Sequence, residues 1–218
     1  MTEILLIRHG ETAWNAVKRL QGHIDVPLNE EGERQAAALG CALLNEPLDA
    51  VISSDLQRAR QTAHEIAALR GMTVQTDSGL RERCYGAFEG LLYSEIQGRY
   101  PDAYAAWQSR DIDARFPEGE RKAETLREFS ERVVSTITRL VSDAKYRKVA
   151  LVAHGGVLEC AYRAAKGLGF SHKRDFDIFN ASINRFRWDG QALHLVQWGD
   201  IRHLQTMEMA VLDEVDRS

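Results

Sequence analysis

The sequence predicts an α/β fold, a three-layer sandwich in which a mostly parallel sheet has helices on both faces. One observation is that short apolar runs alternate with stretches of helical periodicity along the chain. Another is that two of these runs, "ILLIRHG" and "ALVAHGG", end alike, in a histidine followed by glycine. Because ligands bind beyond the carboxyl ends of the strands in such sheets, both histidines are expected at one functional edge.

The expected strands are short runs rich in Val, Ile and Leu. They fall over 3–8, 49–54, 73–77, 148–154 and, as a hairpin, 182–198. Asp189-Gly190 is expected to form the turn of the hairpin, because this dipeptide favours two-residue connections between antiparallel strands. The hairpin offers an edge strand through which a homodimer could form.

The expected helices carry apolar residues three and four positions apart. They fall over 30–45, 55–70, 123–142 and 156–166, with shorter ones around Tyr104 and Trp107 and a short helix or frayed end over 208–218. Asn29 is expected to cap the first, and Ser54 or Asp55 the second, which ends before Gly71. The third has one apolar stripe, formed by Leu126, Phe129, Val133, Ile137 and Leu140.

The composition is typical of a globular protein and argues against several classes of function. The chain has 218 residues, of which 44% are hydrophobic and 28% charged, and its formal net charge is −4. This length, without a visible linker or repeat, predicts one domain over 1–218 with a lid-like excursion at about 83–120. Charges of both signs are interspersed, so we expect no nucleic-acid partner and no membrane partner.

Cysteine usage and the start of the chain predict a cytoplasmic protein. Cys41, Cys84 and Cys160 are odd in number and lack the spacing of a metal site, which is typical of reduced thiols. Only residues 4–7 form a continuous apolar run near the start, too few for the core of a signal peptide.

Arginine and histidine side chains collect where the predicted strands end. Arg8 and His9 follow the first strand, and His154 follows the fourth. Arg58 lies in the first turn of the second helix. Guanidinium groups suit bidentate contact with phosphate oxygens, and the helix that starts at about Gly155 offers amide donors to an anion. The pattern therefore predicts a site for a small phosphorylated ligand.

A metal site is the alternative for the same edge. His9, His154 and Glu82 could supply two imidazoles and one carboxylate. Arg8 and Arg58 argue against this grouping, because two cations beside a divalent metal raise its Coulomb energy. We expect no metal and no cofactor.

Five blocks of the chain together resemble the histidine phosphatase superfamily, the phosphoglycerate mutase-like enzymes. In order they are "LLIRHGETAWN", "QGHIDVPLNEEGERQA", "SSDLQRARQTA", "LRERCYGAFEG" and "ALVAHGG". The resemblance runs from Glu3 to about Leu195, and the stretch "GHIDVPL" looks like the broad-specificity bacterial phosphatases of the family. It implies a phosphoglycerate mutase-like fold, a phosphohistidine intermediate and no metal cofactor.

The resemblance also implies a role for each candidate residue. The roles are the nucleophile, His9; the phosphate pocket, Arg8, Arg58, His154, Asn15 and the Gly155 amide; the proton donor, Glu82; and the rim that meets the substrate, Gln21 and Gly22. In the implied reaction neutral His9 attacks phosphorus in line, while the two arginines and a protonated His154 hold the equatorial oxygens. Glu82, with a pKa that we expect burial to raise, protonates the leaving oxygen and later takes a proton from water.

Two departures from the family pattern bear on the reaction. The motif "ERCYGAFEG" resembles the mutase version, which normally has histidine where Cys84 stands, and Arg121 replaces the serine of a Gly-Glu-Ser pattern. Only 83–120 separate the acid from the next helix, too few residues for the insertion that shields a mutase phosphoenzyme. We therefore expect a phosphatase for small organic phosphomonoesters, with a cofactor-dependent phosphoglycerate mutase as the alternative.

A non-catalytic sensor of phosphorylated ligands is a second alternative, but such proteins typically lose the nucleophile or the acid, and this chain keeps His9 and Glu82.

The excursion itself has two interpretations. Its aromatic and arginine side chains can form a lid over the substrate, or a small core of their own with the arginines in solvent. The side chains concerned are Tyr85, Phe88, Tyr93, Tyr100, Tyr104, Trp107, Arg110, Arg115 and Phe116.

Overall fold

The computed structural model describes residues 1–142 and 145–204, and it contains the predicted sheet. The strands are β1 (Thr2–Arg8), β2 (Ala50–Ser53), β3 (Val74–Thr76), β4 (Lys148–Ala153), β5 (Ile183–Trp188) and β6 (Leu193–Asp200). They lie in the order β3-β2-β4-β1-β5-β6, and the first four of these are mutually parallel. β5 runs antiparallel to both of its neighbours, so the expected mostly parallel sheet with a hairpin at its edge is confirmed. The segment 208–218 lies outside the described residues.

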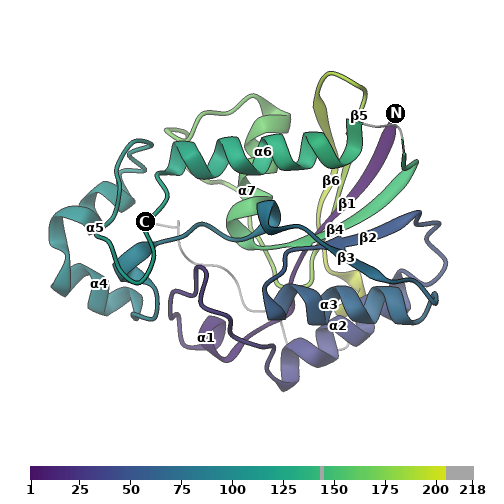
Figure 1. The fold of residues 1–218 in the computed structure, drawn as a ribbon, viewed down its shortest axis with the longest axis horizontal. Helices are drawn as coiled ribbons and strands as arrows, with labels where there is room; N and C mark the ends of the chain where they lie inside the picture. The colour runs from purple at the N-terminus through teal and green to yellow at the C-terminus, as the bar shows by residue number, and fades with distance from the viewer. Residues whose placement is uncertain (143–144, 205–218) are drawn as a thin grey trace.

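Helices cover both faces of the sheet (Figure 1). α2 (Glu30–Ala42) and α3 (Gln57–Ala68) lie on one face, and α6 (Leu126–Ser142) and α7 (Gly155–Lys166) lie on the other. Side chains of β1 alternate between the two layers, because successive residues of a strand point to opposite faces. Leu5 and Ile7 pack with α2 and α3, whereas Ile4 and Leu6 pack with α6 and α7. The three-layer sandwich is therefore confirmed.

Two of the predicted helix starts need correction. α6 begins at Leu126 and not at 123, because Thr125 and Glu128 form a capping box: the Glu128 amide donates to Thr125 Oγ1 at 3.1 Å and the Thr125 amide to Glu128 Oε2 at 2.9 Å. α3 begins at Gln57 after Leu56, so neither Ser54 nor Asp55 caps it directly. Asn29 does cap α2, where its Oδ1 accepts from the Gly32 amide at 2.8 Å.

The other predicted ends lie close to those observed. α2 ends at Ala42, three residues before the predicted end, and α3 ends at Ala68, with Gly71 at a positive φ of 63° just beyond. In the hairpin Asp189 Oδ1 accepts from the Gln191 and Ala192 amides. No helix in the part of the chain that the structure describes is long and apolar enough to cross a membrane.

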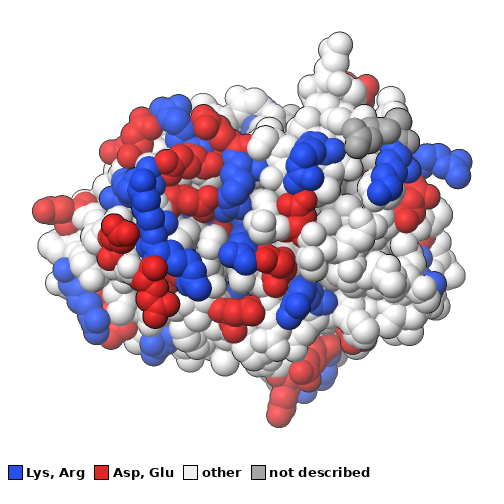
Figure 2. Space-filling model, viewed as in Figure 1, with Lys and Arg blue, Asp and Glu red and all other residues white. Residues whose placement is uncertain are grey.

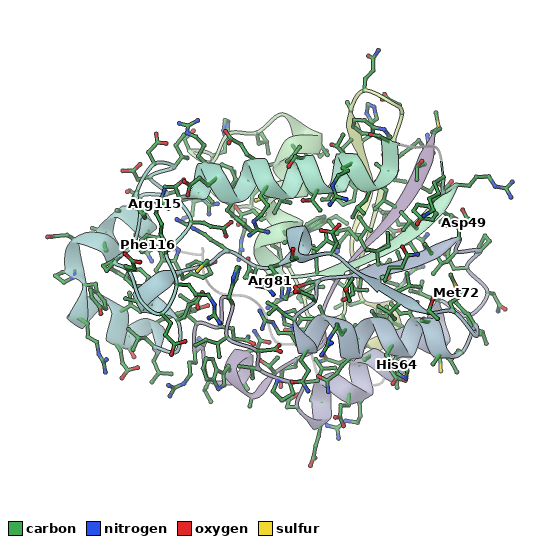
Figure 3. The ribbon with its side chains drawn as sticks, viewed as in Figure 1. Asp49, His64, Met72, Arg81, Arg115 and Phe116 are labelled. Atoms are coloured by element: carbon green, nitrogen blue, oxygen red, sulfur yellow. The ribbon has the colours of Figure 1, made fainter. Side chains whose placement is uncertain are left out.

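The excursion builds a separate lobe beyond the carboxyl ends of the parallel strands, at the left of Figure 1. It contains two short helices, α4 (Tyr93–Arg99) and α5 (Pro101–Gln108), over a small core. That core includes Phe88, Ile96, Trp107 and Phe116, the last of which is labelled in Figure 3. The interpretation as a small core is therefore correct for these side chains. Lys and Arg side chains are interspersed with Asp and Glu over this end of the molecule (Figure 2).

A tight contact between α2 and the loop after β1 predicts the effect of a single methyl group. A Cβ on Gly32 would lie 2.0 Å from the backbone oxygen of Glu11. We expect Gly32→Ala to lower the free energy of unfolding by about 1–3 kcal/mol, the usual cost of overpacking, and to lower the melting temperature by about 2–4 °C for each kcal/mol. Thermal denaturation followed by circular dichroism measures this.

Gly98 provides the matched control, because it lies inside α4 and a Cβ there would meet nothing within 4 Å. We expect Gly98→Ala to raise the free energy of unfolding by about 1 kcal/mol, since alanine favours the helix. Equal changes in the free energy of unfolding for Gly32→Ala and Gly98→Ala would contradict the tight contact between Gly32 and the Glu11 backbone.

Candidate active site

The pairing of β1 with β4 places the two histidines side by side. Arg8 is the register partner of Ala153, so the residues that follow, His9 and His154, leave adjacent strands at the same height. The His9 amide donates to the Ala153 carbonyl at 3.0 Å, and the two ring centroids lie 5.1 Å apart. Both side chains are buried. The structure thus brings the two His-Gly strand ends together, as the sequence predicts.

The ring of His9 is held in one tautomer. Its Nδ1 lies 2.7 Å from the Gly10 carbonyl oxygen, which can only accept, so the proton is on Nδ1. The other nitrogen, Nε2, therefore keeps its lone pair. Burial, and then the positive charges of Arg58 and Arg8, lower the pKa of His9 well below its usual value. The imidazole is neutral at physiological pH, which is the form a nucleophile requires.

His154 is also neutral, which corrects the expectation of a protonated ring. Arg58 Nε donates to His154 Nδ1 at 3.2 Å, so that nitrogen accepts, and His154 Nε2 donates to Ser54 Oγ at 2.8 Å. Burial, followed by the charge of Arg58, lowers the pKa of His154 well below its usual value. Because the Arg58 guanidinium group donates to Nδ1 of His154, that nitrogen carries no proton.

Arg58 joins the strand ends to the rim of the site. Its side chain is buried, with Nη1 donating to the Ile24 carbonyl at 3.0 Å and Nη2 to the Gly22 carbonyl at 2.8 Å. Burial lowers the pKa of Arg58 to about 10, which leaves the group charged at neutral pH. Arg8 is similarly placed, with Nη1 donating to the Ile178 carbonyl at 2.7 Å. Both cations are fixed in position before any ligand binds.

Gly22 lies at a position that favours glycine. Its φ is 52°, and a Cβ there would lie 2.1 Å from Glu89 Oε1. That same carboxylate oxygen accepts from the amides of His23 and Tyr85, both at 3.0 Å. Glu89 therefore ties the rim at 21–24 to the loop that carries Glu82.

Glu82 is half-buried and lies against the first turn of α7. Its Oε2 accepts from the Gly156 amide at 3.0 Å, and its Oε1 accepts from the Arg83 amide at 2.8 Å. A Cβ on Gly156 would lie 2.3 Å from Oε1, so the second glycine of "HGG" makes room for the carboxylate. Arg132 Nη2 donates to the Glu82 carbonyl at 3.1 Å and fixes its backbone.

A single pocket joins all the predicted site residues except His154, which lies beneath its floor behind Arg58. Asn15 and Gln21 are among its lining residues. Asn15 Oδ1 accepts from the amide and the hydroxyl of Thr12, which leaves its Nδ2 group as the donor for an anion. Gln21 Oε1 is buried without a hydrogen-bond partner, and so is available to a bound ligand.

The excursion also contributes to this pocket. Tyr85, Trp107, Arg110 and Phe116 line it together with the strand-end residues, so these side chains form part of the pocket wall. Arg115 behaves differently, since it pairs with Glu128 at the surface, as expected for a solvated arginine.

Three residues of the site were missed at the level of sequence. Ser54 contacts His154, Gly156 contacts Glu82, and Arg83 lines the pocket. The blocks "SSDLQRARQTA" and "ALVAHGG" contain the first two, with Ser54 four residues before Arg58 and Gly156 directly after Gly155. Among the described residues, no three His, Cys, Asp or Glu side chains are grouped so as to hold a metal ion.

Comparisons with known proteins find one matching family and several relatives. Residues 4–201 match the model of the histidine phosphatase superfamily (branch 1). The chain is 39% identical over 206 residues to phosphoglycerate mutase-like protein 4 of Arabidopsis thaliana, covering 93% of this chain and 87% of the relative. It is 35% identical over 209 residues to the metal-independent phosphoserine phosphatase of the same plant, covering 95% and 85%. The solved structure of Bacillus stearothermophilus YhfR is similar, with a TM-score of 0.85, 30% identity and coverage of 94% and 100%.

The two buried neutral histidines predict a loss of stability in acid. The pKa values of His9 and His154 are lowered by folding, whereas in the unfolded chain they return to about 6.5. Below that pH the unfolded chain binds more protons, so the free energy of unfolding falls as pH falls, by about 1.4 kcal/mol per pH unit for each such histidine. Urea denaturation between pH 7.5 and 5.5 in phosphate-free buffer measures the slope.

His154→Gln and His64→Gln form the matched pair for this measurement. His64 is exposed on α3, as Figure 3 shows, and lies outside the site. We expect the slope below pH 6.5 to decrease by about one proton in His154→Gln and to stay as in the wild type in His64→Gln. An unchanged slope in His154→Gln would contradict the neutral, buried state of that ring.

Proposed function

Because the chain belongs to branch 1 of the histidine phosphatase superfamily, whose enzymes act on small phosphomonoesters, we propose that it is a metal-independent phosphatase that works through a phosphohistidine on His9. The observation that carries the proposal is the state of the His9 ring. Its Nδ1 is fixed on the Gly10 carbonyl, so Nε2 keeps the lone pair in a pocket that Arg8 and Arg58 also line.

In the first step Nε2 of His9 attacks phosphorus, and the bond from phosphorus to the leaving oxygen breaks. Arg8 and Arg58 attract the equatorial phosphoryl oxygens, where the charge resides in phosphoryl transfer. The first turn of α7, beginning at Gly155, adds amide donors and the positive end of the helix dipole. His154 acts indirectly, because its Nδ1 accepts from Arg58 Nε and so helps to hold that guanidinium group in place.

Glu82 handles the proton in both steps. It lies at the pocket wall between the two amides that fix its oxygens, and a protonated Glu82 gives its proton to the leaving oxygen. In the second step the carboxylate takes a proton from water, the water oxygen attacks phosphorus, and the bond from phosphorus to His9 Nε2 breaks. Inorganic phosphate leaves and the original state of both residues returns.

The short excursion supports hydrolysis over transfer to a second substrate. Only residues 83–120 lie between the acid and the segment that leads into α6, and many of their aromatic side chains are used in the core of the lobe. We infer that an excursion of this length leaves the phosphohistidine open to water. The free thiols of Cys41, Cys84 and Cys160 support the cytoplasm as the compartment in which this reaction takes place.

Hydrolysis of a panel of phosphomonoesters tests the proposal. We expect wild-type protein to release phosphate in excess chelator and His9→Ala to lose this activity by at least about 10³-fold, because a covalent step is removed. Free phosphate and the isomer formed from 3-phosphoglycerate with its bisphosphate are followed separately. Isomer formation without phosphate release would identify a mutase, and no turnover of any ester would overturn the enzymatic proposal.

Replacement of the acid tests the role of Glu82. We expect Glu82→Gln to lower kcat/KM for alkyl phosphates, which reports formation of the phosphohistidine, by about 10²–10⁴-fold, the usual contribution of a general acid or base. The loss should be smaller for 4-nitrophenyl phosphate, whose leaving oxygen needs no proton. Glu120→Gln, at an exposed position outside the pocket, is the control. An equal loss for both types of ester would argue against proton donation by Glu82.

A further inference from the structure

The imidazole of His23 joins the rim of the pocket to the backbone of the acid, Glu82. His23 follows Gly22 in the stretch "QGHID", and its Nε2 lies 2.7 Å from the Glu82 carbonyl oxygen, 59 residues further along the chain. A carbonyl oxygen can only accept, so Nε2 carries the proton and donates it. His23 itself is not among the residues that line the pocket. Any effect of this ring on the reaction therefore passes through Glu82.

The backbone around His23 is held on both sides. Arg58 Nη2 donates to the Gly22 carbonyl at 2.8 Å, and Arg58 Nη1 donates to the Ile24 carbonyl at 3.0 Å. The His23 amide donates to Glu89 Oε1 at 3.0 Å, and the Glu89 side chain is only 6% exposed. The ring of His23 therefore extends from a segment whose position two buried side chains fix.

Glu82 depends on side chains for the position of its backbone. It lies in an irregular segment between two 3₁₀ turns, Ser78–Leu80 and Gly86–Phe88. Because this segment belongs to no helix or strand, its polar backbone groups need partners elsewhere. The Glu82 carbonyl has two such partners, His23 Nε2 at 2.7 Å and Arg132 Nη2 at 3.1 Å. The acid is thus held from the rim on one side and from α6 on the other.

The ring of His23 is a neutral donor. His23 is half-buried, and burial lowers its pKa below the usual value, so the ring carries no charge at physiological pH. A neutral donor fixes the backbone of Glu82 without a positive charge that would favour the ionised carboxylate over the protonated acid. The charge of Arg132 is balanced by Glu124, whose two carboxylate oxygens accept from Arg132 Nε and Nη2 at 2.7 and 2.8 Å.

We propose that His23 is a positioning residue, which holds Glu82 through its carbonyl so that the carboxyl group reaches the leaving oxygen of the substrate. The inference rests on the proposed function, because Glu82 is the proton donor only in that reaction. Residues 22–24 then place both the acid and the phosphate-binding Arg58 relative to each other. A general acid must lie within hydrogen-bond distance of the atom that it protonates, and a displacement of about 1 Å can lower the rate by about 10²-fold.

The dependence on the leaving group tests this role. His23→Phe keeps a ring but removes the donor, and His23→Gln keeps an N–H donor at the end of the side chain. We expect His23→Phe to lower kcat/KM by about 10–100-fold for the alkyl phosphate that the wild-type protein hydrolyses fastest. The value for 4-nitrophenyl phosphate should change much less, because its leaving oxygen needs no proton. His23→Gln should keep most of the wild-type ratio between the two esters.

His64→Phe makes the same change at an exposed position of α3 and should keep the activity for both esters. Melting curves establish that each variant is folded, and His23→Leu, with a smaller side chain, decides the question if His23→Phe is not. A loss of equal size for the two esters would indicate a general disturbance of the pocket and would overturn the positioning role. An unchanged ratio in a folded variant without the donor would overturn it too.

A double substitution assigns the effect to the acid. On the Glu82→Gln background, His23→Phe should lower kcat/KM for the alkyl phosphate by no more than about twofold, because two residues that act through one group are not additive. An equal loss with and without the Glu82 carboxyl group would contradict the proposal.

Failure of the positioning role and failure of the proposed function give different results. If the wild-type protein hydrolyses both esters and the ratio between them is the same without the His23 donor, the phosphatase stands and the positioning role does not. If the wild-type protein hydrolyses no ester, the proposed function fails, and with it the proton transfer that His23 would support.

Discussion

The buried guanidinium group of Arg58 is the interaction on which the site depends. Its three nitrogens reach His154 and the carbonyls of Gly22 and Ile24, so one side chain joins a strand end to the rim of the pocket. It also fixes the tautomer of His154, whose other nitrogen is bound to Ser54. Arg58 can do this because α3 starts directly after β2, beside β4 in the sheet. The strand order therefore places Arg58 beside β4, and the hydrogen bonds of Arg58 position His154 and the rim of the pocket.

Burial of Arg8 and Arg58 near His9 and His154 costs electrostatic free energy, and a bound phosphoryl anion offsets that cost. Desolvation and the neighbouring arginines keep His9 and His154 neutral, so the protein stabilises the nucleophilic form at the expense of stability in acid. A phosphoryl group reverses the local field, since it brings negative charge to the point where Arg8 and Arg58 converge. In the proposed reaction, the positive charges that keep His9 and His154 neutral are therefore the same charges that attract the phosphoryl group.

The strands and the sheet edge that they share could be predicted from the sequence, whereas most side-chain contacts between distant segments could not. The strands and the histidines at their ends are local patterns, and the sheet brings His9 and His154 together as expected. The protonation of His154 was wrong, because it depends on Arg58, 96 residues away. The start of α6 was placed three residues early, although Thr125 and Glu128 carry the capping signal in the sequence itself. The double use of the excursion, as core and as pocket wall, follows only from packing.

One helix sets the spacing between the two ends of the pocket. Gly155 and Gly156 begin α7 and meet the expected phosphoryl group and Glu82, and one turn later Glu159 holds a cluster of arginine side chains that includes Arg163. Because both lie on one regular helix, the distance between its first amides and the cluster at Glu159 is set by the rise per residue. The other walls come from the excursion and from the loop after α7, which packing and Arg163 hold in place. The fold therefore fixes the distance between the strand-end residues at one end of the pocket and the arginine cluster at Glu159 at the other.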